Sequence, residues 1–177
     1  MAAKQKNLSS FADQSLPDGD DLLFAIVVSD WNSEITDALY NGAMETLRAN
    51  GVGENNVTTV RVPGSFELPQ AAAMLAETQS LNAIICIGCV IQGETRHFEF
   101  ISQAVAQNCM KVAIDYLTPV IFGVLTTDTV EQAKERAGGK HGNKGVEAAA
   151  AALRMANLKD IMIPDDFDSF DPFDEPW

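Results

Sequence analysis

The chain has 177 residues, 46% of them hydrophobic, so it can bury roughly 70% of its unfolded surface in one domain without disulfides or a metal. Acidic side chains number 25 against 12 basic ones, and the net charge of -13 disfavours nucleic acids and anionic lipid surfaces as partners. No apolar run reaches the ~20 residues of a membrane-spanning helix, and the N-terminus lacks the apolar segment of a secretion signal.

Residues 1–21 are expected to form a flexible N-terminal arm, because they are polar and rich in turn-forming residues. The first apolar run, Leu22–Val28, predicts a strand. A polar loop follows, in which Asn32 or Ser33 can cap a helix that runs to about Ala49.

This alternation of strand, polar loop and helix recurs three times. The expected strand and helix pairs are Val57–Val62 with Phe66–Thr78, Ala83–Ile91 with His97–Tyr116, and Val120–Leu125 with a helix from near Thr129. Strands that are continuously apolar and separated by helices are typical of a parallel sheet covered on both faces. We therefore predict an α/β protein, a three-layer α/β/α sandwich with a four-stranded parallel sheet.

A glycine-rich segment, Ala137–Gly145, interrupts the last helical region. We expect a kink there that serves assembly or binding, followed by an alanine-rich helix at Val146–Leu158. The domain is thus expected over residues 22–160. Residues 161–177 form an acidic, aromatic tail, for which two interpretations stay open: a disordered solubilising extension or a short docking motif.

The three cysteines, Cys86, Cys89 and Cys109, lie in apolar surroundings, and their odd number favours a reducing compartment, so we expect a cytoplasmic protein. Cys86 and Cys89 have C-x-x-C spacing. A redox pair needs its first thiol at a helix N-terminus, whereas this pair lies inside a strand pattern. Both are therefore predicted to be packing residues.

Ligands of open parallel sheets bind outside the carboxyl ends of the strands, where this chain has polar loops. Trp31 is shaped to stack on a flat heterocycle, with a cover over the sheet edge as the alternative. Gly93–Thr95 precedes a helix and offers a seat for phosphate or carboxylate, although ordinary turns look similar. Arg136, with Lys140 and Lys144 nearby, favours an anionic ligand over a solvated helix end.

His97 begins a predicted helix, where the helix dipole disfavours its imidazolium and leaves a neutral ring able to accept a proton near pH 7. This suits a general acid/base, and a structural histidine is the alternative. The sequence contains no dinucleotide-binding glycine fingerprint, P-loop, nucleophile-elbow serine or metal-ligand spacing. We therefore expect neither a metal nor a cofactor.

Five ordered motifs within about residues 22–158 resemble the lumazine synthase family of riboflavin biosynthesis. They are Trp31–Asn32, Gly64–Pro69, Gly88–Phe98, Pro119–Thr126 and Glu135–Gly145. The resemblance implies a flavodoxin-like fold and a transferase without metal or organic cofactor. Such enzymes condense 5-amino-6-(ribitylamino)uracil with 3,4-dihydroxy-2-butanone 4-phosphate to 6,7-dimethyl-8-ribityllumazine, releasing phosphate and water.

The resemblance also implies roles for individual residues. It assigns contacts with the uracil substrate to the loops after the first three strands: Trp31, Asn32, Ser65, Phe66, Glu67, Val90 and Ile91. It assigns phosphate binding to Gly93, Glu94, Thr95 and Arg136, and proton transfer to His97. Phe122 and Lys144 match residues that the family contributes from a neighbouring subunit of a pentamer, so a monomer is expected to be inactive.

Members of this family form pentamers, decamers and sixty-subunit icosahedral shells. The short link Gly138–Asn143 is typical of icosahedral members, so we expect homo-pentamers that assemble into a 60-mer shell, with riboflavin synthase as a candidate partner. Gln92, Arg96 and Glu99 depart from the family pattern and leave the local charge around His97 open. Two other interpretations remain: a catalytically silent shell-forming or flavin-binding homologue, and a flavodoxin-like carrier or receiver domain suggested by fold class alone.

Overall fold

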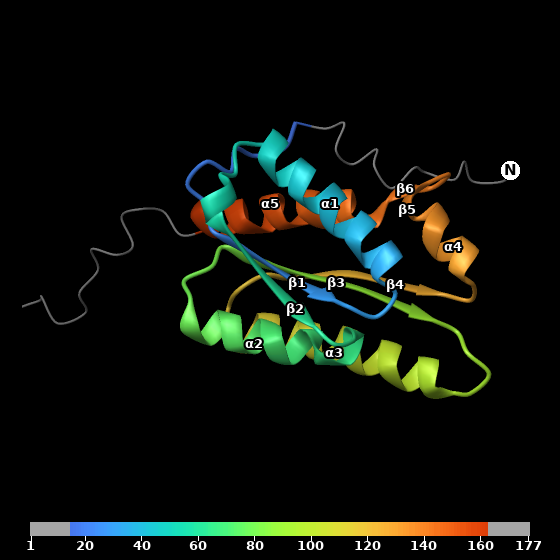
Figure 1. The fold of residues 1–177 in the computed structure, drawn as a ribbon. Coiled ribbons are helices and arrows are strands. Elements are labelled where there is room, and N and C mark those ends of the chain that lie inside the picture. The colour runs from blue at the N-terminus through green and yellow to red at the C-terminus, as the bar shows by residue number, and fades with distance from the viewer. Residues whose placement is uncertain (1–14, 163–177) are drawn as a thin grey trace, which may run out of the picture.

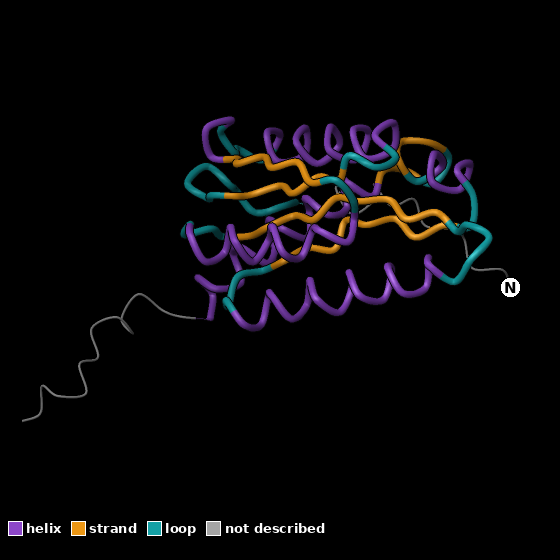
Figure 2. The backbone as a smooth tube through the Cα atoms, turned by 60° about the horizontal axis from the view of Figure 1, so that its bottom comes forward, coloured by secondary structure: helices purple, strands orange, loops and turns teal. Residues whose placement is uncertain are grey.

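The structure is a computed structural model, and it describes residues 15–162. Four strands form a parallel sheet in the order β2-β1-β3-β4, with helices on both faces (Figures 1 and 2). The strands are β1 (Phe24–Ser29), β2 (Val57–Val62), β3 (Ala83–Ile91) and β4 (Val120–Thr127). This arrangement confirms the predicted three-layer sandwich. The expected acidic tail from residue 163 onward lies outside the described residues.

Two helices cover each face of the sheet, and a short one lies beyond the end of β4 (Figure 1). One layer contains α1 (Ser33–Ala49) and α5 (Lys144–Met162), and the other contains α2 (Leu68–Thr78) and α3 (His97–Asp115). The short helix is α4 (Val130–Glu135), and two 3-10 turns are η2 (Glu54–Asn56) and η3 (Ser65–Glu67). Within the described chain, no helix combines the length and apolar character that crossing a bilayer requires.

The core follows from the alternation of side chains along the central strands. On β1, Phe24 and Ile26 pack with α1 and α5, whereas Ala25 and Val27 pack with α2 and α3. All six residues of β1 are buried because a strand lies on each side and a helix layer on each face. The expectation that every strand is buried on both faces is wrong for β2, an edge strand that is partly exposed.

Asn32 immediately precedes α1, but its side chain does not cap the helix. Its backbone is left-handed, with φ 61° and ψ 44°, and its Nδ2 donates a hydrogen bond to the Cys89 carbonyl at 3.0 Å. The amide thus joins the loop after β1 to the end of β3. The predicted Asn32 or Ser33 cap is therefore wrong, because Ser33 is already the first residue of α1.

The glycine-rich interruption is a hairpin rather than a kink. Strands β5 (Ala137–Gly139) and β6 (Gly142–Asn143) pair antiparallel, and α5 begins directly afterwards. Gly138 and Gly142 have φ of 112° and 86°, values that side-chain-bearing residues rarely adopt. A side chain at either position would strain the turn, which explains why the segment is glycine-rich.

The last residues of the predicted N-terminal arm pack against the domain. Leu16 is partly buried against the core, and the Gly19 N–H donates to the Asn50 carbonyl at 2.8 Å. One leucine and a buried glycine turn are enough to hold residues 16–21 along the end of α1. All three cysteines are free and buried, which confirms that Cys86 and Cys89 are packing residues.

Candidate active site

The loops after the four parallel strands, the start of α3, helix α4 and the hairpin β5-β6 all lie at one end of the molecule (Figure 1). The parallel direction of the strands brings every carboxyl end to the same edge of the sheet. This edge is where ligands bind in open parallel sheets. The candidate residues of the sequence analysis therefore gather here, except Phe122, whose position is described below.

A hollow of about 400 Å³ lies beside Trp31, whose side chain is 72% exposed. Asn32, Ile91 and Val130 contribute to the lining of this hollow. The Trp31 backbone is held by its N–H, which donates to the Pro63 carbonyl at 3.2 Å. The indole of Trp31 is thus held at this edge of the sheet and is open to solvent.

An ion-pair network that the sequence analysis missed supports the loop of Trp31. Arg61 on β2 places Nε 2.6 Å from Asp30 Oδ1 and Nη2 2.9 Å from Asp37 Oδ1. These two carboxylates raise the pKa of the Arg61 guanidinium, so it remains charged. The only signal for this ion-pair network is the register of β1 and β2. Val28 on β1 lies opposite Arg61 on β2, and Asp30 comes two residues after Val28.

The end of β3 extends past β1. Strand β1 pairs with β3 only as far as Ile87, whereas β4 continues to Ile91. The carbonyl of Cys89 accepts the Asn32 amide instead of a strand partner. Main-chain groups of Val90 and Ile91 therefore lie at the open corner next to Trp31, where a heterocycle could contact them.

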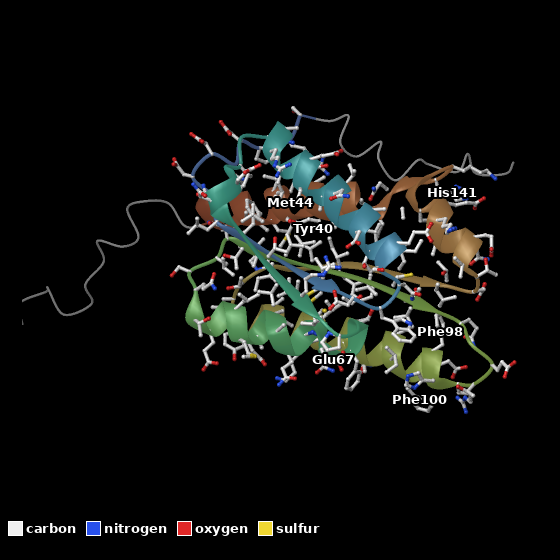
Figure 3. The ribbon with its side chains drawn as sticks, in the orientation of Figure 1. Tyr40, Met44, Glu67, Phe98, Phe100 and His141 are labelled. Atoms are coloured by element: carbon white, nitrogen blue, oxygen red, sulfur yellow. The ribbon has the colours of Figure 1, made fainter. Side chains whose placement is uncertain are left out.

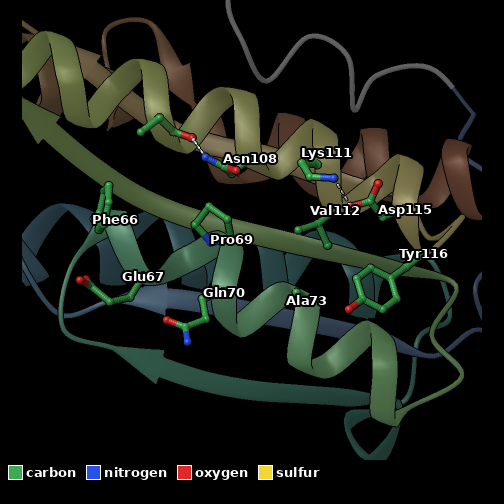
Figure 4. Close-up of a pocket in the computed structure, with 11 residues that line it drawn as sticks. Phe66, Glu67, Pro69, Gln70, Ala73, Asn108, Lys111, Val112, Asp115 and Tyr116 are labelled. Atoms are coloured by element: carbon green, nitrogen blue, oxygen red, sulfur yellow. Dashed lines mark hydrogen bonds and ion pairs between the residues drawn. The ribbon is translucent and has the colours of Figure 1, made fainter.

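Phe66 and Glu67 line a second hollow, of about 440 Å³, between α2 and α3 (Figure 4). Phe66 is 58% exposed, and neither Trp31 nor Asn32 lines this groove. Ser65 is buried nearby, and its Oγ has no hydrogen-bond partner among the described residues. The aromatic residues expected around one substrate thus border two separate hollows of the single chain.

The loop before α3 is open to solvent. A Cβ placed on Gly93 would meet no atom within 4 Å, and Glu94, Thr95 and His97 are all exposed. Within the loop, the exposed Gln92 donates from Nε2 to the carbonyl of its neighbour Gly93 at 2.7 Å. A backbone loop held in this way at the start of a 19-residue helix suits an anion.

Arg96 and Glu99, the two charged residues that left the local charge around His97 undecided, form an ion pair with each other. Arg96 donates to Glu99 Oε2 from Nε at 3.2 Å and from Nη2 at 2.9 Å. The Arg96 guanidinium also lies 5.8 Å from the centre of the Phe100 ring. His97 is the first residue of α3, beside this pair, and its N–H donates to Thr95 Oγ1 at 3.4 Å.

Arg136 and Lys144 frame the hairpin. Arg136 follows α4 and donates from Nη1 to the Gln132 carbonyl at 2.9 Å, while Lys144 Nζ lies 2.6 Å from Glu147 Oε1. Each cation is therefore oriented by its own helix, with further guanidinium N–H groups of Arg136 available as donors.

Phe122 is not at the carboxyl edge of its own sheet. It lies opposite Cys86 in the β3–β4 ladder, five residues before Thr127, so it is roughly 16 Å from the carboxyl end of the strand at about 3.3 Å per residue. Its side chain is half-buried on the edge strand β4. The single chain does not bring Phe122 to the hollow beside Trp31.

Comparison with known proteins identifies the family. The family model of 6,7-dimethyl-8-ribityllumazine synthase matches residues 21–160. A 6,7-dimethyl-8-ribityllumazine synthase of Porphyromonas gingivalis is 51% identical over 161 residues, which cover 91% of this chain and 100% of the relative. One from Cytophaga hutchinsonii is 52% identical over 155 residues, covering 88% and 97%. One from Stenotrophomonas maltophilia is 50% identical over 135 residues, covering 76% and 87%. The chain therefore belongs to the 6,7-dimethyl-8-ribityllumazine synthase family.

Proposed function

We propose that this chain condenses 5-amino-6-(ribitylamino)uracil with 3,4-dihydroxy-2-butanone 4-phosphate, releasing phosphate and water and forming 6,7-dimethyl-8-ribityllumazine. The observation that carries the proposal is the match of the family model over residues 21–160 together with relatives of that name about half identical along nearly their whole length. The catalytically silent alternative has no specific observation in its favour.

The uracil ring stacks on Trp31, with Phe66 closing the stack and Glu67 serving the ribityl chain. Support comes from the exposure of both aromatic side chains and from the open end of β3 beside Trp31. Main-chain groups of Val90 and Ile91 recognise the polar edge of the heterocycle. Stacking together with fixed backbone hydrogen bonds holds the amine ready for attack on the ketone.

The phosphate of the second substrate lies on Gly93, Glu94 and Thr95 and is completed by Arg136. The exposed loop, the hydrogen bond of Gln92 within it and the helix that follows support this placement. His97 transfers protons during imine formation, phosphate elimination and ring closure. Both substrates are already reactive, so positioning supplies up to ~7–11 kcal/mol of the acceleration, and acid/base help adds roughly 10²–10⁴-fold.

The site is completed by a second copy of the chain, with Phe122 and Lys144 supplied by the neighbour. The geometry of one protomer supports this proposal, because Trp31 and Phe66 border different hollows and Phe122 lies five residues before the carboxyl end of β4. A neighbour that places its edge strand β4 against this corner would close the cavity. The active form is therefore a homo-oligomer.

Helix α3 provides a surface for that association. On α3, Phe100, Met110 and Ile114 are 64%, 61% and 64% exposed, and Met110 and Ile114 lie one helical turn apart. Leu117, which follows the end of the helix, is 83% exposed. These exposed apolar side chains, the α3 stripe, support an interface between copies of the chain.

The oligomer is a pentamer that assembles further into a 60-mer shell in the cytoplasm. The compact hairpin between α4 and α5, which contains no insertion, supports the shell, and three free buried cysteines support a reducing compartment. Riboflavin synthase is the candidate partner of the assembly. Analytical ultracentrifugation tests the shell, and a species near the mass of five chains as the only form would contradict it.

The activity is tested by incubating the purified chain with both substrates and following lumazine absorbance. Formation of 6,7-dimethyl-8-ribityllumazine with one phosphate released is the expected result. Arg136→Ala is expected to raise the KM of the phosphorylated ketone by roughly tenfold or more, because it removes a charge-assisted hydrogen bond to phosphate. An unchanged KM would remove Arg136 from the phosphate site, and an inactive wild-type chain that binds both substrates would favour the silent homologue.

A further inference from the structure

His141, the second histidine of the chain, has no role in the proposed reaction. It lies between β5 and β6, and Figure 3 shows it on the hairpin at the same end of the molecule as α4. Its side chain is only 13% exposed, and its Nε2 lies 3.3 Å from Glu135 Oε2. A tight two-strand turn does not require a sheltered imidazole, so the contact with this carboxylate needs an explanation.

The hairpin is bonded to the last turn of α4 at two consecutive residues. The His141 N–H donates to the Glu135 carbonyl, and the Lys144 N–H donates to the Arg136 carbonyl, both at 2.8 Å. The last carbonyls of a helix have no partner within the helix itself. The hairpin satisfies them here, and the His141–Glu135 contact closes the same junction through side chains.

The hairpin is itself fixed to α1, so it provides a firm support. Asn143 Nδ2 donates to the Ala38 carbonyl at 3.0 Å, and its Oδ1 accepts the Gly145 N–H at 2.8 Å. A Cβ on Gly42 would lie 2.6 Å from Asn143 Nδ2, so the two elements are packed to the limit of contact. The position of the hairpin therefore determines where α4 ends.

We propose that His141 is a positioning residue for Arg136: it holds Glu135, and so fixes the backbone from which the next residue presents its guanidinium to the phosphate of the substrate. The inference rests on the proposed function of Arg136. One N–H of Arg136 already donates to the Gln132 carbonyl at 2.9 Å. The position of the remaining N–H groups relative to a ligand therefore depends on where α4 ends. His141 itself touches no substrate.

If His141 were merely structural, its loss would change the stability of the hairpin and would affect the KM of both substrates alike. A positioning role changes only the binding of phosphate, and a side chain that keeps an N–H donor toward Glu135 preserves it. The test therefore compares His141→Ala with His141→Gln in the full-length protein. The measured quantities are both KM values, kcat, the inhibition constant of inorganic phosphate and the melting temperature.

His141→Ala is expected to raise the KM of the phosphorylated ketone and the inhibition constant of phosphate roughly 5–10-fold, which is the effect of one lost hydrogen bond. The KM of the uracil substrate should stay within about twofold. His141→Gln should recover most of the phosphate affinity. The matched control is Arg48→Ala, which breaks an ion pair of 2.7 Å with Glu54 and should change neither KM.

An unchanged phosphate inhibition constant in His141→Ala, or an equal rise of both KM values that Gln does not rescue, overturns the inference. If His141→Ala does not fold, Glu135→Ala removes the acceptor of the same contact from the other side, and the same phosphate-specific loss is required of it. A wild-type chain that forms no lumazine would instead contradict the proposed function. A wild-type chain that turns over while both variants match it would contradict only the role of His141.

Discussion

His97 is the first residue of α3, and its side chain is exposed to solvent. The neighbouring Arg96 and Glu99 form an ion pair with each other. In such a position an imidazole can exchange protons with a ligand and with water. This is the environment that a proton-transfer residue needs at the mouth of a site that still has to close.

His97→Ala should lower kcat about 10²-fold without abolishing turnover, because positioning of the two reactive substrates persists when the proton carrier is lost. Steady-state kinetics by lumazine absorbance measure the loss. The inhibition constant of inorganic phosphate should stay at the wild-type value. Complete inactivity with intact phosphate binding would show that His97 does more than move protons, and full activity would remove it from the mechanism.

The thiol of Cys89 is buried on the α1 and α5 side of β3, and burial raises its pKa to about 11 from the ordinary value of 9.0. The folded state thus disfavours the thiolate more than the unfolded state does. The stabilising effect is fully present below pH 9 and is lost as the pH rises through 11, so stability should fall across that interval.

Guanidinium unfolding at pH 7.5, 9 and 10.5 measures this loss in the wild type and in Cys89→Ala. The variant is less stable at neutral pH because it loses buried volume, but its additional loss above pH 9 should be smaller. Parallel curves for the two proteins over the whole range would show that the Cys89 thiol does not carry the alkaline dependence.

At the scale of elements, the start of α5 and helix α1 approach each other closely at Gly145. A Cβ on Gly145 would collide with the carbonyl of Leu39, which is part of the rigid helix α1 and has nowhere to move. Gly145 is therefore required by the close approach of two elements. Its φ is not among the positive values, so the requirement is spatial and does not come from the turn.

Gly145→Ala should lower the free energy of unfolding by about 2–3 kcal/mol, the usual cost of forcing an extra methyl into a packed site. Gly53→Ala is the matched control, because a Cβ there would lie 3.9 Å from its nearest neighbour, Asn56. Thermal unfolding of both variants measures the difference. Equal melting temperatures would mean that the start of α5 moves away from α1 at little cost.

The elements that the sequence predicted well are those whose signal is local. The apolar runs of β2 and β3 have the predicted bounds, because a run flanked by turn residues defines a strand wherever it packs. The hairpin was missed since glycines mark a break without specifying its shape. The side chain of Asn32 was misassigned because its partner, the Cys89 carbonyl, lies 57 residues away.

Only part of the candidate site could be predicted, because only part of it has a local signal in the sequence. The topology of a parallel sheet places all loops after the strands at one edge, so Trp31 and His97 could be assigned to that edge from sequence. The Arg61 network depends on strand register and the His141 contact on the shape of the hairpin. Neither is encoded in a local pattern.

At the scale of the whole molecule, the residues expected around one substrate border two open hollows in the described part of the protomer, one beside Trp31 and one beside Phe66. If Trp31 acts from one protomer and Phe122 from its neighbour, a defect in either residue disables a site, but the two defects need not occur in the same site. Oligomers assembled from two different inactive chains would then contain some intact sites.

Trp31→Ala and Phe122→Ala chains, unfolded together and reassembled in equal amounts, should recover activity in about a quarter of the sites, whereas each variant alone stays nearly inactive. Lumazine formation before and after mixing measures the recovery. Mixed oligomers without any recovery would place both residues in a site that belongs to one protomer.

Ile114→Glu on the α3 stripe should give small, inactive species in sedimentation.

The hollow beside Trp31 opens outward. If a neighbouring chain completes it, as proposed, a ligand there gains its full contact area only in the assembly. Ligand binding and subunit association then share one coupling free energy, and each strengthens the other by the same factor. Dilution should weaken the apparent affinity for substrate, and saturating substrate should delay dissociation on dilution. An inhibitor that fills this corner would slow dissociation of the subunits. The lifetime of the assembly would then report the fraction of sites that are occupied.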